Sequence, residues 1–156
     1  MNVESDLLNS LESNLGYYFN NKSLLLQAIT HKTFAYESLK FDVRDNQRLE
    51  FLGDSVLNLA ITDYLYNSYP YFSQGDMTRK RSLLVNKQFL AEKTKEIEIA
   101  QYLLLGKGEE KLGGRYNPTN LSSALEAIIG AIYLDGGWEE AKKFILNKLV
   151  GENFYE

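Results

Sequence analysis

The chain has 156 residues, 44% of them hydrophobic and 13% aromatic, which is enough for one core and short for two domains, so one domain over residues 1–156 is expected. The absence of cysteine excludes disulfides and thiolate metal sites, and the single histidine excludes sites that need two imidazoles. The formal net charge of −4 argues against a free-standing nucleic-acid binder, because affinity for a phosphate backbone comes largely from Lys and Arg.

Membrane insertion and secretion are not expected. The longest uninterrupted apolar run, from Ala127 to Leu134, is less than half the length of a bilayer crossing. The N-terminus carries Glu4 and Asp6, where a signal peptide would need positive charge followed by an apolar stretch. A soluble protein of the cytoplasm, with no membrane partner, is therefore expected.

Helical periodicity dominates the chain. Apolar residues recur at intervals of three and four, only two prolines interrupt them, and no stretch shows a convincing strand pattern, so an all-α fold is expected. Asp76 and Asn86 are predicted N-caps, and Gly136-Gly137 is predicted to separate the last two helices. Helices are predicted near residues 4–14, 22–30, 47–69, 76–84, 86–97, 119–135 and 138–150.

The predicted helix over residues 47–69 carries a polar stripe on a circumference that is otherwise mostly apolar. On a helical wheel the stripe spans about 80°, and it consists of Gln47, Glu50, Asp54 and Asn58. An acidic pair four residues apart is usually a solvated face, but like charges at this spacing repel each other. A divalent cation at Glu50 and Asp54 would compensate that repulsion.

A second stripe lies on the predicted helix over residues 119–135, where Ser123, Glu126 and Gly130 share one face. Taken alone, Glu126 fits a solvent contact or a lysine partner as well as it fits a metal site. If this helix packs against the first, three carboxylates converge, which suits an oxygen-coordinated Mg²⁺ ion. Such a site can activate water and stabilise charge on a phosphodiester.

Together these motifs resemble those of the ribonuclease III family. Residues 46–57, Asn-Gln-Arg-Leu-Glu-Phe-Leu-Gly-Asp-Ser-Val-Leu, are similar to the family signature over the whole stretch. The other matches follow in the family's order and are Thr30-His31, Gly75-Asp76-Met77, Gly106 to Glu110 with Gly113-Gly114, and Glu126 to Leu134. The resemblance is to the endonuclease domain, without the double-stranded-RNA-binding domain that often follows it.

The resemblance implies an all-helical homodimer that binds double-stranded RNA, uses Mg²⁺ and cuts both strands to leave short 3′ overhangs. Carried over by position, Glu50 and Glu126 would be metal ligands, with Asp54 and Glu126 as catalytic residues. Asp54 would support the activation of water. Phe51 matches the residue that enters a socket on the partner subunit.

The chain also departs from the family pattern. Ser123 stands where the family has Asp, and a hydroxyl is a poor substitute for a carboxylate towards a hard cation. Gln47 and Gln74 stand where the family usually has Glu. These departures leave two alternatives to the enzyme: a module that binds structured RNA but cuts it poorly because Ser123 breaks the metal site, and a purely structural dimerisation domain.

Two long connections remain, over residues 31–46 and 101–118, and connections of this length often carry function. The second contains glycines and three basic residues that could approach an RNA backbone, namely Lys107, Lys111 and Arg115. They are predicted RNA contacts, and they argue against the purely structural alternative.

Overall fold

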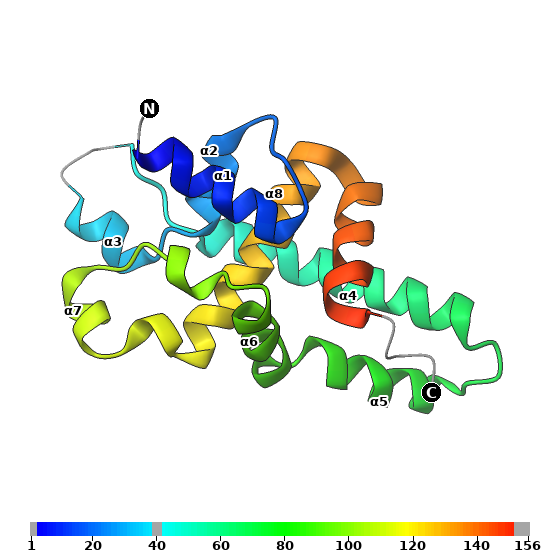
Figure 1. Ribbon diagram of the computed structural model, residues 1–156. Coiled ribbons are helices and arrows are strands. Elements are labelled where there is room, and N and C mark those ends of the chain that lie inside the picture. Colours follow the sequence, from blue (N-terminus) through cyan, green and yellow to red (C-terminus); the bar gives the residue numbers. More distant parts are fainter. Residues whose placement is uncertain (1–2, 39–41, 152–156) are drawn as a thin grey trace.

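The computed structural model describes residues 3–38 and 42–151 (Figure 1). Helices make up most of this part of the chain, and it contains no β-strand, which confirms the all-α prediction. The elements are α1 (Val3–Leu15), α2 (Lys22–Ala28), α3 (Lys32–Glu37), α4 (Gln47–Ser68), α5 (Gln74–Val85), α6 (Lys87–Glu96), η1 (Ala100–Tyr102), α7 (Lys107–Lys111), η2 (Gly114–Tyr116), α8 (Pro118–Ile145) and η3 (Leu146–Val150). No helix among the described residues has the length and apolarity needed to cross a membrane. The cytoplasmic location stays a prediction.

The predicted helices agree with the structure to within about two residues at their ends, as is usual for helix boundaries. The short helices α3 and α7 were not predicted, because six and five residues are too few to display a helical period. Both lie inside the two long connections.

One predicted cap is confirmed and another is wrong. The Asn86 side chain accepts a hydrogen bond from the backbone N–H of Phe89, as an N-cap does. Asp76 is not an N-cap, because Ser73 is the N-cap of α5 and Asp76 is the third residue of that helix. The two form a capping box, in which each side chain accepts a hydrogen bond from the other residue's backbone N–H.

The predicted separation at Gly136-Gly137 appears as a sharp bend within α8. Gly137 has φ +85° and ψ −176°, a conformation that only glycine adopts without strain. In Figure 1 the first segment of α8 runs through the middle of the molecule, and the second, in red, turns back beside it. The chain therefore uses both segments to cover the same core.

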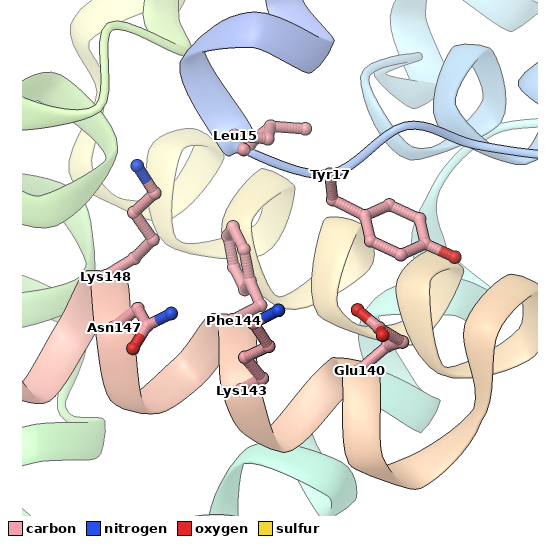
Figure 2. A pocket seen from close by; sticks show the side chains of 8 residues that line it. Leu15, Tyr17, Glu140, Lys143, Phe144, Asn147 and Lys148 are labelled. Carbon is pink, nitrogen blue, oxygen red and sulfur yellow. The ribbon is translucent and has the colours of Figure 1, made fainter.

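Hydrogen bonds to Asp135 hold the segment after α1 against this bend. The two carboxylate oxygens accept hydrogen bonds from the backbone N–H groups of Asn20 and Asn21, each at 2.9 Å, and from the Tyr17 hydroxyl at 2.8 Å. Figure 2 shows Tyr17 beside Glu140, which lies after the bend. Burial, together with the negative charges of Asp135 and Glu140, raises the pKa of Tyr17, so its hydroxyl stays protonated and remains a donor.

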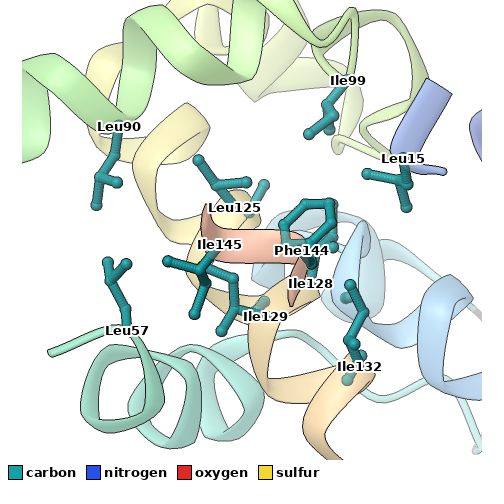
Figure 3. Packing of buried hydrophobic residues seen from close by; sticks show 14 of the residues in the cluster. Leu15, Leu57, Leu90, Ile99, Leu125, Ile128, Ile129, Ile132, Phe144 and Ile145 are labelled. Carbon is teal, nitrogen blue, oxygen red and sulfur yellow. The ribbon is translucent and has the colours of Figure 1, made fainter. Parts of the chain in front are cut away.

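The core is built around the first segment of α8, which is buried on nearly every side. Figure 3 shows Leu125, Ile128 and Ile129 of this segment grouped around Ile145 at the end of α8, with Leu57 of α4 beside them. All five side chains are fully buried. Each contributes roughly 2–3 kcal/mol through burial, so α4 and α8 form a rigid pair.

Backbone contacts join the two long connections. The N–H of Leu104 donates to the carbonyl of Ile29 (2.9 Å), and the N–H of His31 donates to the carbonyl of Leu104 (3.0 Å), which makes an isolated bridge. Further along, the N–H of Gly106 donates to Thr33 Oγ1 and the N–H of Lys107 to Glu37 Oε2, each at 2.9 Å. The contacts anchor α7 against α3, near the N-terminal end of α4.

Candidate metal and RNA site

The acidic pair of α4 lies on the side of the helix that faces solvent. Asp54 is exposed and Glu50 is half-buried. The amide of Asn58 donates to Asp54 Oδ1 at 3.2 Å, so the polar stripe predicted from the sequence is present and one of its amides orients one of its acids.

Glu126 faces this pair from α8. Burial, followed by the negative charges of Asp54 and Glu50, raises the pKa of Glu126 from its ordinary 4.5 to about 8. No hydrogen bond or ion pair to its carboxylate occurs in the part of the chain that the structure describes. This half-buried acid therefore has acidic neighbours and no compensating cation from the protein.

Ser123 lies one helical turn before Glu126 and reaches the same place. Its hydroxyl donates to Glu50 Oε1 at 2.9 Å. This hydrogen bond joins α8 directly to the acidic pair of α4, and the hydroxyl stands where the resemblance implies a carboxylate.

The three carboxylates interact through their charges but are not tightly gathered. Within residues 3–38 and 42–151, no group of three or more His, Cys, Asp or Glu side chains is close enough together to hold a metal ion. The available donors are nevertheless carboxylate and hydroxyl oxygens, which a hard cation prefers, and Mg²⁺ keeps several waters in such sites. A cation would relieve the burial and repulsion that raise the pKa of Glu126, so the residues fit a loosely held Mg²⁺ ion.

An open depression of about 480 Å³ adjoins Glu50 and Ser123. The two joined connections and the beginnings of α4 and α8 provide the rest of its wall, which consists of His31, Lys32, Asn46, Gln47, Glu109, Asn117, Thr119 and Asn120. Glu50, Ser123 and Gln47 were predicted from their helical faces. The other wall residues were not, because most of them lie in the two connections, which have no helical period, and Thr119 and Asn120 lie in the first turn of α8.

The three basic residues predicted to contact RNA have different environments. Lys107 and Lys111 are exposed, and no hydrogen bond or ion pair to either ammonium group occurs among the described residues. The guanidinium of Arg115, by contrast, donates to both carboxylate oxygens of Glu110 and to the carbonyls of Ala100 and Leu103, at 2.8–2.9 Å. Arg115 therefore fastens η2 to η1 and α7.

Phe51 has 81% of its surface exposed although it lies between the buried residues of α4. Leu59 of the same helix and Leu83 of α5 are also exposed, at 57% and 62%. If these side chains form one contiguous apolar patch, it is of the kind that a partner covers.

The fold and site thus define an all-helical domain with an acidic site where two central helices cross. A family model described as "Ribonuclease-III-like" matches residues 21–153, and the chain belongs to this family. It is 48% identical over 150 residues to ribonuclease 3 of Carboxydothermus hydrogenoformans, covering 96% of this chain and 63% of that protein. Ribonuclease 3 of Listeria innocua is 44% identical over 135 residues, covering 86% and 59%. The chain spans about three-fifths of the length of these curated relatives.

Solved structures agree with this assignment. The nuclease domain of ribonuclease III from Campylobacter jejuni matches with a TM-score of 0.84 and 40% identity, over 95% of this chain and 96% of that one. A second structure of that domain, described as flexible in a region involved in dimer formation, gives 0.83 and 42%, over 92% and 96%. Dicer from Pichia stipitis matches at 0.59 and 26%, over 85% of this chain and 54% of that chain.

Proposed function

We propose that the chain is the endonuclease domain of a Mg²⁺-dependent endoribonuclease that hydrolyses phosphodiester bonds in double-stranded RNA during RNA processing. The observation that carries the proposal is the environment of Glu126, a half-buried carboxylate that faces Glu50 and Asp54 without a cation from the protein. Strongly perturbed acids of this kind are concentrated at functional sites. Relatives named ribonuclease 3 support the same reading.

Glu50 and Glu126 would hold the ion, with the Ser123 hydroxyl keeping the Glu50 carboxylate in place through Oε1. When bound, Mg²⁺ would supply positive charge at the scissile phosphate and lower the pKa of nearby water. The remaining carboxylate, Asp54, accepts one hydrogen bond at Oδ1 from the amide of Asn58. Its Oδ2, which accepts none among the described residues, would accept a proton from the attacking water.

The substrate would be a duplex that approaches along the exposed side of α4. Lys107 and Lys111 are predicted phosphate contacts, because both are exposed and both belong to the connection that contributes Glu109 and Asn117 to the wall of the depression. Arg115 stays a prediction as an RNA contact, although its donors already serve the protein. Phe51 would enter the partner subunit of a homodimer, and pairing two acidic sites would allow both RNA strands to be cut.

A structured-RNA-binding module that cuts poorly is the second candidate function. The specific observation in its favour is that a hydroxyl stands at Ser123 and that the carboxylates of the described residues do not close around one point. This candidate shares the fold, the dimer and the RNA surface with the first one. It differs in cleavage alone.

Incubation of the purified protein with duplex RNA and Mg²⁺ tests the proposal. We expect duplex fragments that appear only with the metal and disappear in Glu126→Gln, which keeps the shape of the side chain and removes its charge. Glu139→Gln, an exposed acid after the bend in α8, is the matched control and should cut like the wild type. Binding of duplex RNA without any cleavage would establish the second candidate, and loss of both would remove the RNA proposal.

A further inference from the structure

His31 has two roles at once, because it begins α3 and also lines the depression beside Glu50 and Ser123. A helix-end role is what an isolated histidine usually has, and the structure confirms that role. The capping role uses Nδ1 of the imidazole and leaves Nε2 without a function.

The hydrogen bonds of His31 define where its proton lies. Nδ1 accepts the backbone N–H of Thr33 at 3.2 Å, and a backbone N–H can only donate, so Nδ1 carries no hydrogen. Thr33 Oγ1 lies 2.7 Å from the same Nδ1 and already accepts the N–H of Gly106 at 2.9 Å, which leaves the hydroxyl hydrogen to point at Nδ1. The neutral ring therefore carries its hydrogen on Nε2, as assigned from this network.

The Nε2–H group is open to the depression. It has no hydrogen-bond partner among the described residues, and no buried side-chain nitrogen or oxygen in that part of the chain lacks one, so Nε2 reaches solvent. His31 itself is half-buried, and the depression is the space that it lines. A donor held in one tautomer and one orientation is thus presented to the depression that Glu50 also lines.

The rest of the wall suits a ligand rich in acceptor oxygens. Lys32 contributes an exposed ammonium group, and Asn117 an amide whose oxygen is used by the N–H of Thr119 while its nitrogen remains a donor. The acidic members of the wall are Glu50 and Glu109. Of these, Glu109 Oε1 already accepts from the amide of Asn120 at 2.9 Å. A sugar–phosphate backbone offers acceptor oxygens of the kind that these donors can bind.

We propose that His31 is a substrate-contacting residue, which donates from Nε2 to an oxygen of the RNA backbone in the depression beside Glu50 and Ser123. The proposal rests on the proposed function, because it assumes that this site takes RNA. Thr33 and Gly106 act as positioning residues, since Thr33 holds the ring by Nδ1, the N–H of Gly106 orients the Thr33 hydroxyl, and Nε2 is left for the substrate. The join between the two long connections thereby gains a function in binding.

Two substitutions test the functions of Nδ1 and Nε2 separately. In His31→Asn the side-chain oxygen replaces Nδ1 as the cap of α3, but the amide is too short to reach the position of Nε2. In His31→Gln the amide nitrogen comes near the position of Nε2 while the cap is weakened. Thermal unfolding measures the cap, and the affinity for a fluorescent RNA duplex, without divalent cation so that nothing is cut, measures the contact.

We expect His31→Asn to unfold at the wild-type temperature and to bind duplex RNA about tenfold more weakly, as loss of one hydrogen bond to a charged acceptor predicts. His31→Gln should unfold at a lower temperature and keep its affinity within about twofold, since its donor remains. Wild-type affinity in His31→Asn, or equal loss in both variants, would overturn the contact. A wild-type protein that binds no duplex RNA would overturn the proposed function as well.

A duplex with 2′-deoxyribose around the bond that the wild type cuts identifies the oxygen. If His31 contacts a ribose hydroxyl, the wild type should lose affinity for this duplex and His31→Asn should show no additional loss. If it contacts a phosphate oxygen, His31→Asn should be weaker than the wild type on both duplexes by the same factor. Either pattern supports the contact, and equal binding of wild type and variant to both duplexes contradicts it.

Discussion

Gly53 and Gly130 bring the backbones of α4 and α8 into direct contact. A Cβ atom on Gly53 would lie 1.7 Å from the carbonyl oxygen of Glu126, and one on Gly130 would lie 2.4 Å from the carbonyl oxygen of Leu49. Both distances are far shorter than any real contact of a Cβ atom. The absence of side chains at these two positions therefore sets the distance between Glu126 and the acids of α4.

Gly53→Ala should separate the two helices. Because the clash is with backbone atoms that cannot rotate away, we expect a loss of about 3 kcal/mol or more in the free energy of unfolding. Gly108→Ala is the control, since nothing lies within 4 Å of the added atom, and it should change stability by less than about 0.5 kcal/mol. Urea unfolding measures both. Equal stability of the two variants would contradict the close crossing.

Ser123→Asp should convert a loosely held ion into a more tightly held one. The new carboxylate would stand beside Glu50 Oε1, where the hydroxyl now donates, so the metal-free variant gains repulsion and the metal-bound variant gains a ligand. We expect faster cleavage of duplex RNA at lower Mg²⁺, and a larger rise in unfolding temperature on adding Mg²⁺ than in the wild type. Ser123→Ala, which only removes the hydroxyl, should show neither gain. If Ser123→Asp binds duplex RNA yet stays inert at every Mg²⁺ concentration, the binding-module alternative replaces the enzyme.

Phe51→Ala should weaken self-association. The ring is 81% exposed in the isolated chain, and burial of a whole aromatic side chain contributes about 2–3 kcal/mol, which corresponds to a change of thirtyfold or more in the dissociation constant. Tyr71→Ala removes a 98% exposed ring from the connection between α4 and α5 and is the control. Sedimentation equilibrium gives the constants. A wild type that stays monomeric at micromolar concentration would remove the dimer and the two-strand cleavage model.

The basic residues of the second connection should fall into two groups, those that affect RNA affinity and one that affects stability. Lys107→Ala with Lys111→Ala should leave unfolding unchanged and weaken duplex binding, with a salt dependence reduced by about one to two ions. Arg115→Ala should instead destabilise the protein by about 1–3 kcal/mol, because Glu110 and the carbonyls of Ala100 and Leu103 lose their donor. Thermal unfolding and binding at two salt concentrations distinguish them. Destabilisation by the lysine pair would contradict this division.

Asp135 should account for part of the loss of stability in acid. Burial opposes its ionisation, but the N–H groups of Asn21 and Asn20 and the Tyr17 hydroxyl outweigh burial and hold the pKa of Asp135 below its ordinary value. Since the pKa is lower in the folded state, this contribution is present above the unfolded pKa and is lost as pH falls through the folded pKa.

Asp135→Asn should therefore lower the free energy of unfolding by about 1 kcal/mol at pH 7 and by progressively less towards pH 2. Glu139→Gln, an exposed acid near the same bend, should track the wild type across the whole range. Urea unfolding at a series of pH values gives the comparison. A difference between Asp135→Asn and the wild type that is independent of pH would assign the effect to packing.

The acidic face of α4 and the face of α8 that meets it were predictable, because both belong to long helices with a clear apolar period. Ser123 and Glu126 were placed on one face of their helix, and the structure has the first bonded to Glu50 and the second influenced by its charge. The apolar period is also typical of helices that pack centrally, as α4 and α8 do. It could not predict how closely they approach, which depends on Gly53 and Gly130 being opposite each other.

The structure of the two long connections could not be predicted from the sequence, for a different reason. Their structure depends on backbone groups, which are the same at every residue and leave no trace in composition. The carbonyls of Ala100 and Leu103 decide the role of Arg115, and the N–H of Gly106 helps to decide the tautomer of His31. Asp76 was mistaken for the N-cap because the helix begins one turn earlier, at Ser73, whose hydroxyl accepts the N–H of Asp76.

The pairing between Thr30 and Leu104 has a consequence for how this domain can vary. The two connections that border the depression are also joined by hydrogen bonds from the N–H of Gly106 to Thr33 and from the N–H of Lys107 to Glu37. The conformation of each connection therefore depends on that of the other. A chimera that takes only one connection from a relative would mismatch the donors and acceptors that join the two connections. Both connections would have to be exchanged together.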